Sequence, residues 1–229
     1  LEAPGTIFNQ PLTRDFRGCK IAFSANLGGL PVEPAVSAVL AASRSVFEAL
    51  GCEVVNAEPD IAEADEIFML WRAWRTELRI TPLMAEHGEK FKDTVIWNAE
   101  QGIPITGPQL ARAEAKRTEL YHRMREFMAQ YEFLILPVNQ VTPFAIDLDY
   151  PREINGVPMQ TYIEWQKSLY LISALGNPAI SVPAGFTPNG LPVGVQIVGR
   201  HRADFGVLQL AYAFEQSTQF GLKRPPLCL

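Results

Sequence analysis

The side chains that could carry chemistry are scattered along this chain of 229 residues. A histidine acts as a general base only beside a group that orients its ring, and His87, His122 and His201 stand singly. We therefore expect surface or packing roles for all three. No serine has the G-x-S-x-G setting of a nucleophile, no G-x-x-x-x-G-K-[ST] loop could hold phosphate, and no H-E-x-x-H pair could bind zinc. The residues themselves predict neither a catalytic group nor a metal site.

The three cysteines, Cys19, Cys52 and Cys228, are far apart and odd in number. This pattern suits neither a disulfide framework nor a zinc knuckle. Cys19 and Cys52 stand at the starts of predicted strands, where buried structural thiols are the expected role. Cysteines of this kind suit a reducing compartment, so we predict a cytoplasmic protein. We also predict that it has no cofactor.

Composition limits the kind of partner. The net charge is −5 and no basic stripe is present, which argues against nucleic acid, since binding phosphates needs a concentrated basic surface. No apolar run approaches the ~20 residues of a membrane span. The first residues also lack the basic and apolar regions of a signal peptide. Neither nucleic acid nor a membrane is expected as a partner.

The elements that must position any site follow from hydrophobic periodicity and breaker residues. We predict strands at residues 19–24, 53–56, 133–137, 179–186 and 193–198, and helices at 35–50, 61–80, 109–131, 159–174 and 205–219. The first strand, helix and strand form a βαβ unit if the strands are parallel. Gly51 is expected just beyond the first helix, Thr81 and Pro82 are expected to end the second, and Asp204 is expected to cap the last. The fold class is α/β, a mixed β-sheet flanked by helices in a single unit over residues 1–229.

Residues 175–199 are an apolar segment interrupted by glycine and proline. Asn189 and Gly190 favour a tight turn between two strands. Because Pro183, Pro188 and Pro192 lack an N–H, the hairpin should be irregular. Taken alone, the segment is a core hairpin.

Two aromatic residues of the second helix, Trp71 and Trp74, admit two interpretations. They could offer a flat surface to a ligand, or they could pack the helix, which is the commoner role of such side chains. The charged face of the helix at 109–131 is expected to be solvated surface and not a phosphate site.

The hairpin also carries a resemblance to a known family. The run Gly176-Asn-Pro-Ala-Ile-Ser-Val-Pro-Ala-Gly-Phe186, the run Asn189-Gly-Leu-Pro-Val-Gly-Val-Gln-Ile-Val-Gly199, and Asp204 with a helix reaching Glu215 resemble the C-terminal region of amidase signature hydrolases. Residues 17–24, 49–55 and 131–137 agree in the order that such enzymes show. The resemblance implies amide hydrolysis by a serine nucleophile, a second serine in a cis peptide, a lysine, and an oxyanion hole.

The glycine- and serine-rich signature of that family is absent here. Ser24 and Ser181 lack its setting, so no catalytic residue is assigned. The chain is therefore expected to be the C-terminal portion of a longer amidase, with the N-terminal catalytic half and a small-molecule amide as partners. Within this portion, the connection at 138–157 and the helix carrying Tyr162, Trp165 and Gln166 are predicted to contact the substrate. The alternative is that these aromatics pack under the hairpin.

Two other hypotheses remain for the whole chain. It could be a truncated amidase relative without catalysis that acts as a binding or assembly module, or an unrelated α/β binding domain. If half of a sheet is missing, open strand edges and apolar surface remain. Such an edge makes a homodimer possible.

Overall fold

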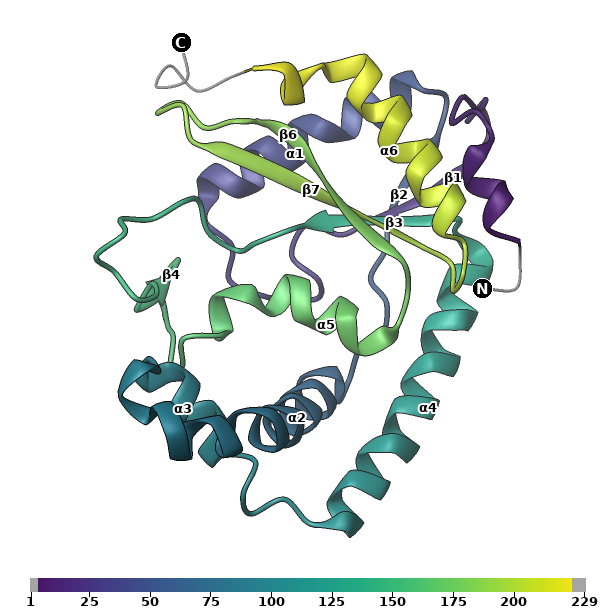
Figure 1. Ribbon diagram of the computed structural model, residues 1–229. Helices are drawn as coiled ribbons and strands as arrows, with labels where there is room; N and C mark the ends of the chain where they lie inside the picture. The colour runs from purple at the N-terminus through teal and green to yellow at the C-terminus, as the bar shows by residue number, and fades with distance from the viewer. Residues whose placement is uncertain (1–3, 224–229) are drawn as a thin grey trace.

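A five-stranded mixed sheet runs through the computed structural model, which describes residues 4–223 (Figure 1). Its strands stand in the order β2-β1-β3-β7-β6. Their bounds are β1 Lys20–Phe23, β2 Glu53–Asn56, β3 Phe133–Pro137, β6 Ala179–Phe186 and β7 Pro192–Gly199. Strand β3 is parallel to β1, β7 is antiparallel to β3, and β6 is antiparallel to β7. The predicted mixed sheet is confirmed.

Helices cover both faces of this sheet, as Figure 1 shows. Helices α1 and α6 pack on one face, and α2, α4 and α5 pack on the other. Their bounds are α1 Pro34–Ala49, α2 Ala64–His87, α3 Asp93–Glu100, α4 Gly107–Gln130, α5 Lys167–Leu175 and α6 Asp204–Thr218. Short 3₁₀ helices and a two-stranded hairpin complete the fold: η1 Gly5–Asn9, η2 Gly88–Lys90, η3 Glu164–Gln166, η4 Phe220–Leu222, β4 Glu153–Ile154 and β5 Val157–Pro158.

The predicted βαβ unit is present, with β1 and β2 parallel and α1 crossing between them. Gly51 follows α1 with a φ of +90°, the conformation that makes glycine the usual residue after a helix end. A Cβ atom there would lie 2.7 Å from Cγ of Arg17. Both the backbone and the space therefore require glycine at this turn.

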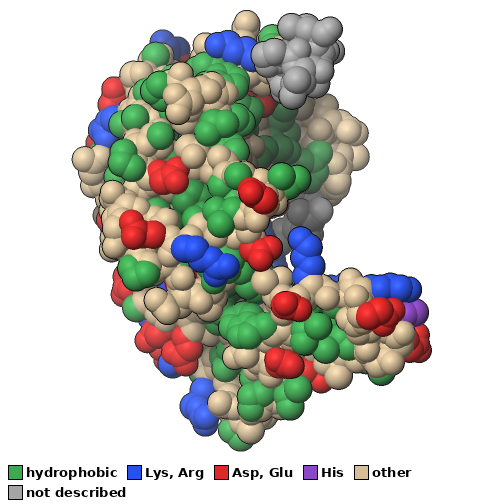
Figure 2. Space-filling model, turned by 90° about the vertical axis from the view of Figure 1, so that its left-hand side faces the viewer, with side chains coloured by type: hydrophobic (Ala, Val, Ile, Leu, Met, Phe, Trp, Pro, Cys, Tyr) green, Lys and Arg blue, Asp and Glu red, His purple; other side chains and the backbone are tan. Residues whose placement is uncertain are grey.

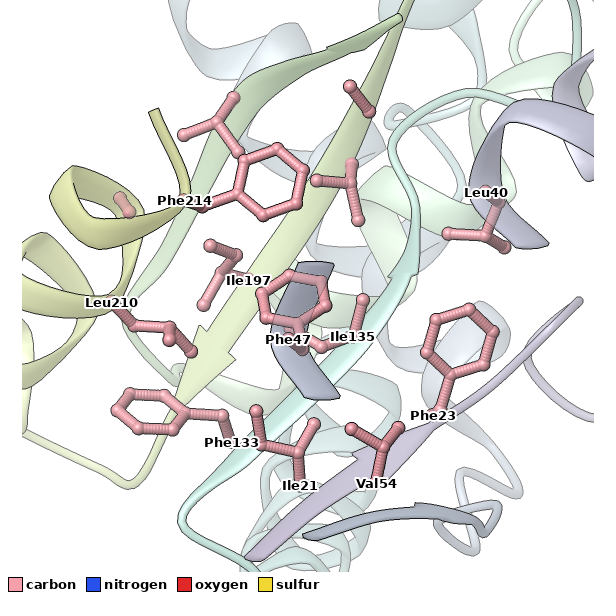
Figure 3. Close-up of a cluster of buried hydrophobic side chains, with 14 of the residues drawn as sticks. Ile21, Phe23, Leu40, Phe47, Val54, Phe133, Ile135, Ile197, Leu210 and Phe214 are labelled. Carbon is pink, nitrogen blue, oxygen red and sulfur yellow. The ribbon is translucent and has the colours of Figure 1, made fainter. Parts of the chain in front are cut away.

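Strand β3 lies at the centre of the core because its side chains are apolar on both faces. Phe133 and Ile135 face α1 and α6, and Leu134 and Leu136 lie in the opposite cluster with α2, α4 and α5. This alternation follows from the two-residue period of a strand. Figure 3 shows Phe133 and Ile135 among the side chains that meet beneath α1 and α6.

The hairpin β6-β7 is irregular, as its prolines predict. Its register shifts between Pro183 and Gly185, and Gly190 takes a φ of +80° in the turn. Within residues 4–223, β6 pairs with β7 alone, so its other edge is free. We call this the open edge.

Helix α2 does not end at Thr81 and Pro82, as the sequence suggested, but continues to His87. A proline inside a helix has no N–H to donate, so one backbone hydrogen bond is lost, and its ring crowds the carbonyl of the residue four positions earlier. That carbonyl belongs to Leu78, whose side chain is 61% exposed. The disturbed turn therefore lies on the outer side of the helix, where the carbonyl can be hydrated.

Two helix starts also differ from expectation. The helix predicted from residue 159 begins at Lys167, because the Glu164 carboxylate accepts hydrogen bonds from the Gln160 N–H (3.0 Å) and the Thr161 hydroxyl (3.2 Å) and folds this segment into a turn. At α6, Ala203 holds the cap position and Asp204 is the first helical residue. Asp204 does not cap through its side chain, although its charge still suits the helix N-terminus.

Candidate substrate-binding site

A pocket of about 260 Å³ lies where the hairpin meets the long connection after β3. It is lined by residues 138, 139 and 141–144 of the connection, by Trp165 of η3, by Ser181 of β6, and by residues 192–194 at the start of β7. Most of these side chains are apolar. Segments that are far apart in the sequence thus meet beside the open edge.

The connection is fixed in place by hydrogen bonds that its loop sequence alone does not reveal. The Glu33 carboxylate accepts from both the N–H (2.8 Å) and the hydroxyl (2.9 Å) of Thr142. Gln140, whose side chain is fully buried, donates to the Pro31 carbonyl at 3.0 Å and accepts from the Lys167 N–H at 2.8 Å. One glutamine therefore holds the connection against the start of α5.

Helix α5 is also held from the opposite side, by α2. Asp65 accepts from the Lys167 ammonium at 2.9 Å and from the Tyr170 hydroxyl at 2.7 Å. Burial, together with this hydrogen bond to Asp65, raises the pKa of Tyr170. The tyrosine stays neutral and acts as a hydrogen-bond donor that positions α5 under the pocket.

Trp165 packs against neighbouring apolar side chains and also lines the pocket. Its ring meets Phe144 edge to face at 5.3 Å, and it packs on a small cluster of Val141, Ile154 and Met159. Its indole N–H is buried and has no hydrogen-bond partner in the part of the chain that the structure describes. An unpaired buried donor costs free energy, so this N–H is an exception among the buried polar groups around the pocket.

Tyr162 lies in a different place. Its hydroxyl accepts from Arg72, and its ring meets Trp97 edge to face at 6.0 Å. It lines a separate pocket of about 270 Å³ together with Asp93, Thr94 and Tyr150. The structure therefore does not bring Tyr162 and Trp165 into one cavity.

Gln166 ends η3 and is half-buried. Its side chain makes no hydrogen bond within residues 4–223 and lines neither of these two pockets. It follows Trp165 directly, so its amide remains free for a partner or ligand near the same turn.

Sequence reasoning did not place Ser181 and Gly194 in the site. A Cβ atom on Gly194 would lie 3.0 Å from Oγ of Ser181 and 3.1 Å from Cγ2 of Val138. Glycine therefore keeps this wall of the pocket open. The only sequence signal was the break that Gly194 makes in a valine-rich strand, which marks a close approach.

A second hollow of about 330 Å³ lies next to the pocket, between β6 and α5. Val138 and Ser181 line both hollows, and Leu169 and Ser173 of α5 line the second. Figure 2 shows the molecule hollowed between its sheet-bearing upper part and its helical lower part. The site is a groove beside an unpaired strand and not an enclosed cavity.

The remaining candidate residues do not form a second reactive site in the described part of the chain. Cys19 and Cys52 are buried free thiols, and a hydrogen bond with Cys52, together with burial, raises the pKa of Cys19. Cys228 lies outside the described residues.

Among residues 4–223, no three His, Cys, Asp or Glu side chains come together as metal ligands. No helix in this range has the length and apolar character needed to cross a bilayer.

Comparison with known proteins gives a consistent result. The model of the family described as Amidase matches residues 3–208. An acylamidase of Rhodococcus erythropolis is 31% identical over 229 residues, which are 98% of this chain and 48% of that protein. A second relative belongs to the glutamyl-tRNA(Gln) amidotransferase of Enterococcus faecalis. It is 26% identical over 243 residues, covering 95% of this chain and 48% of that protein.

The fold agrees with solved structures. A bacterial aryl acylamidase of the amidase signature family superposes with a TM-score of 0.82 at 26% identity, over 93% of this chain and 48% of that one. The chain thus spans about half the length of the relatives it matches. The hairpin, the walls of the pocket and all five strands of the sheet lie within residues 3–208, which the family model matches. The chain belongs to the amidase signature family.

Proposed function

We propose that this chain is the substrate-binding portion of an amidase signature hydrolase, which cleaves a carboxylic amide to an acid and ammonia or an amine. The serine, cis-serine and lysine of catalysis come from polypeptide outside this chain. The observation that carries the proposal is a largely apolar pocket, with the unpaired N–H of Trp165, directly beside a strand edge that has no partner within residues 4–223.

The pocket suits one part of an amide substrate. Its apolar walls would bury an acyl or aryl group, and the Trp165 N–H would donate to an oxygen that the walls otherwise exclude from water. Tyr162 and Gln166 are proposed as further contacts from the same turn, with Tyr162 serving a substrate long enough to reach its separate pocket.

The open edge supplies a place for the catalytic half. An edge strand presents unpaired N–H and C=O groups and pairs readily with another strand. Around β6, Leu169 is 39% exposed and Phe186 is 37% exposed. We propose that a strand of the catalytic half pairs here, which would bring its serines to the pocket. Without that half, a homodimer through the same edge is the expected substitute.

The relatives suggest a substrate to test first. Two of them are named for acylamide cleavage, so a small anilide such as 4-nitroacetanilide is the proposed first substrate. A cytoplasmic location belongs to the same proposal, since Cys19 and Cys52 are free thiols, the state that a reducing compartment maintains.

The test is reconstitution. The chain alone should release no 4-nitroaniline, and a complex of the chain with the polypeptide that carries the family signature should release it. Trp165→Ala should weaken that activity. Phe8→Ala, which removes an exposed aromatic ring that lines neither pocket, serves as the control. Turnover by the pure chain alone would contradict the proposal.

The alternative is a truncated relative that binds without catalysis. The shape of the groove beside the open edge suits that role as well. Stable binding of a signature-bearing polypeptide without any turnover on acylamides or other carboxylic amides would favour this module.

A further inference from the structure

A second concave site lies on the helical side of the molecule, between α2, α4 and the end of α5. It is a cavity of about 670 Å³ and shares no lining residue with the Trp165 pocket. We call it the arginine groove. Its cationic lining consists of Arg72, Arg75, Arg79 and Arg117.

Most of the positive charge of this groove has no carboxylate beside it. No Asp or Glu is among its lining residues. Arg72 is held by Asn98 and Tyr162, and Arg117 lies 3.8 Å from Glu114. Arg75 and Arg79 are exposed and form no ion pair or hydrogen bond within the described residues 4–223.

The geometry of α2 places these charges together. Positions 72, 75 and 79 fall on one helical face, since residues three and four apart are neighbours. Like charges at that spacing repel and destabilise a helix. An anion between them would remove this cost, and guanidinium groups bind carboxylates through paired hydrogen bonds.

The remaining walls are aromatic. Trp71 and Trp74 meet edge to face at 5.3 Å, and both line the groove with Phe68. The indole N–H of Trp71 is buried and has no hydrogen-bond partner among the described residues. Phe68 stacks on Tyr170 at 4.4 Å, so this wall is fixed from behind. Of the two roles that the sequence left open for these tryptophans, packing is the one seen here, and ligand contact stays a prediction.

We propose that the arginine groove binds a small organic carboxylate with a flat apolar body. The body lies against Phe68, Trp71 and Trp74, and the carboxylate lies between Arg75 and Arg79. The choice of a carboxylate among anions rests on the proposed function, because amide hydrolysis releases one. The binding itself needs no turnover, so it can be tested without the catalytic half.

The test compares 3-phenylpropionate with 3-phenylpropionamide by isothermal titration calorimetry on the chain. The two probes have the same shape and differ in charge. The acid should bind, and the amide should bind at least about tenfold more weakly, because hydrogen bonds to charged groups are the stronger ones. The double variant Arg75→Gln/Arg79→Gln should weaken binding of the acid by about 10- to 100-fold.

Arg112→Gln is the matched control, because Arg112 is an exposed arginine of α4 outside the groove. It should leave binding unchanged. Trp71→Phe, which keeps an apolar ring and removes the N–H, should weaken binding several-fold. Circular dichroism of each variant checks that the helices remain.

Three results would overturn the proposal. One is equal binding of acid and amide, and another is an equal effect of the Arg112 and Arg75/Arg79 variants. The third is displacement of the probe by the signature-bearing polypeptide, which would make the groove an interface with the catalytic half. Failure of reconstituted hydrolysis would leave the titration result standing, so the two proposals fail separately.

Discussion

The face of the sheet under α1 and α6 and the region around the open edge are built in opposite ways. On the first, which we call the closed face, Phe47 and Phe214 are fully buried and stack at 4.9 Å. Around the open edge, Phe144 and Leu169 are more than a third exposed and the Trp165 N–H has no partner within residues 4–223. Figure 3 shows Phe47 and Phe214 among the side chains that meet in the closed face.

This difference separates stability from binding. A filled core gains from apolar burial and close packing. Exposed apolar side chains and an unpaired N–H gain nothing until something covers them. The region around the open edge therefore adds little to stability by itself, and the closed face supplies the packing that holds the chain folded.

The largest expected effect is a cavity in the closed face. Phe214→Ala should cost about 3–5 kcal/mol of the free energy of unfolding, since the stacked ring is lost and the space cannot collapse. Phe144→Ala, the matched change at the open edge, should cost less than about 1 kcal/mol because its ring is 37% exposed. Urea unfolding measures both. Equal costs would mean that the region around the open edge contributes as much to stability as the closed face does.

The closed face was the part that sequence could predict. Its strands and helices follow from the apolar residues around Phe133, Phe47 and Phe214. Which helices share this face became clear only from the structure. Local pattern and long-range packing agree there.

The open region could not be predicted in the same way. Its loop is held by Gln140 and by Glu33, through hydrogen bonds between residues 109 positions apart. No local pattern encodes such contacts. The same is true of the start of α5, where the Glu164 turn overrides helical periodicity, and of the separation of Tyr162 from Trp165, which Arg72 fixes.

The next effect compares two glycines of β7. A Cβ at Gly199 would lie 2.4 Å from Cγ2 of Val207, a buried residue of α6. Gly199→Ala should therefore cost about 1–3 kcal/mol by overpacking. At Gly194 the nearest atom is the Ser181 hydroxyl at 3.0 Å, which can rotate. Gly194→Ala should cost less than about 1 kcal/mol and should narrow the pocket. Thermal unfolding of both variants tests the ranking.

A smaller effect depends on pH. The Arg14 guanidinium binds the Glu132 carboxylate at 2.5 and 2.9 Å, and this hydrogen-bonded pair holds the pKa of Glu132 below its usual range. The stabilisation is therefore fully present above the unfolded pKa of about 4.3 and is lost as pH falls through the lower folded pKa.

Glu132→Gln should cost about 1 kcal/mol at pH 7, because the pair is half-exposed and screened by solvent. The difference from the native chain should shrink as the pH falls from about 5 to the acid transition, where the carboxylate takes up its proton. Glu66→Gln, which breaks the more exposed pair with Lys116 on the helical side, should cost only a few tenths of a kcal/mol. If the difference in the free energy of unfolding between the native chain and Glu132→Gln stays constant down to acid pH, the pKa of Glu132 is not the source of its stabilising effect.

The smallest effect on stability concerns the Tyr170 hydroxyl and the Trp165 indole N–H. Tyr170→Phe removes a hydroxyl that donates to Asp65 at 2.7 Å and should cost about 1 kcal/mol. Trp165→Phe removes an N–H that has no partner among residues 4–223, so it should change stability by less than about 0.5 kcal/mol. If the Trp165 N–H serves a substrate oxygen, the same variant should raise KM in the reconstituted enzyme, and should raise it more than Tyr170→Phe does. A Trp165→Phe variant that loses stability and keeps KM would assign this N–H to the fold instead of the site.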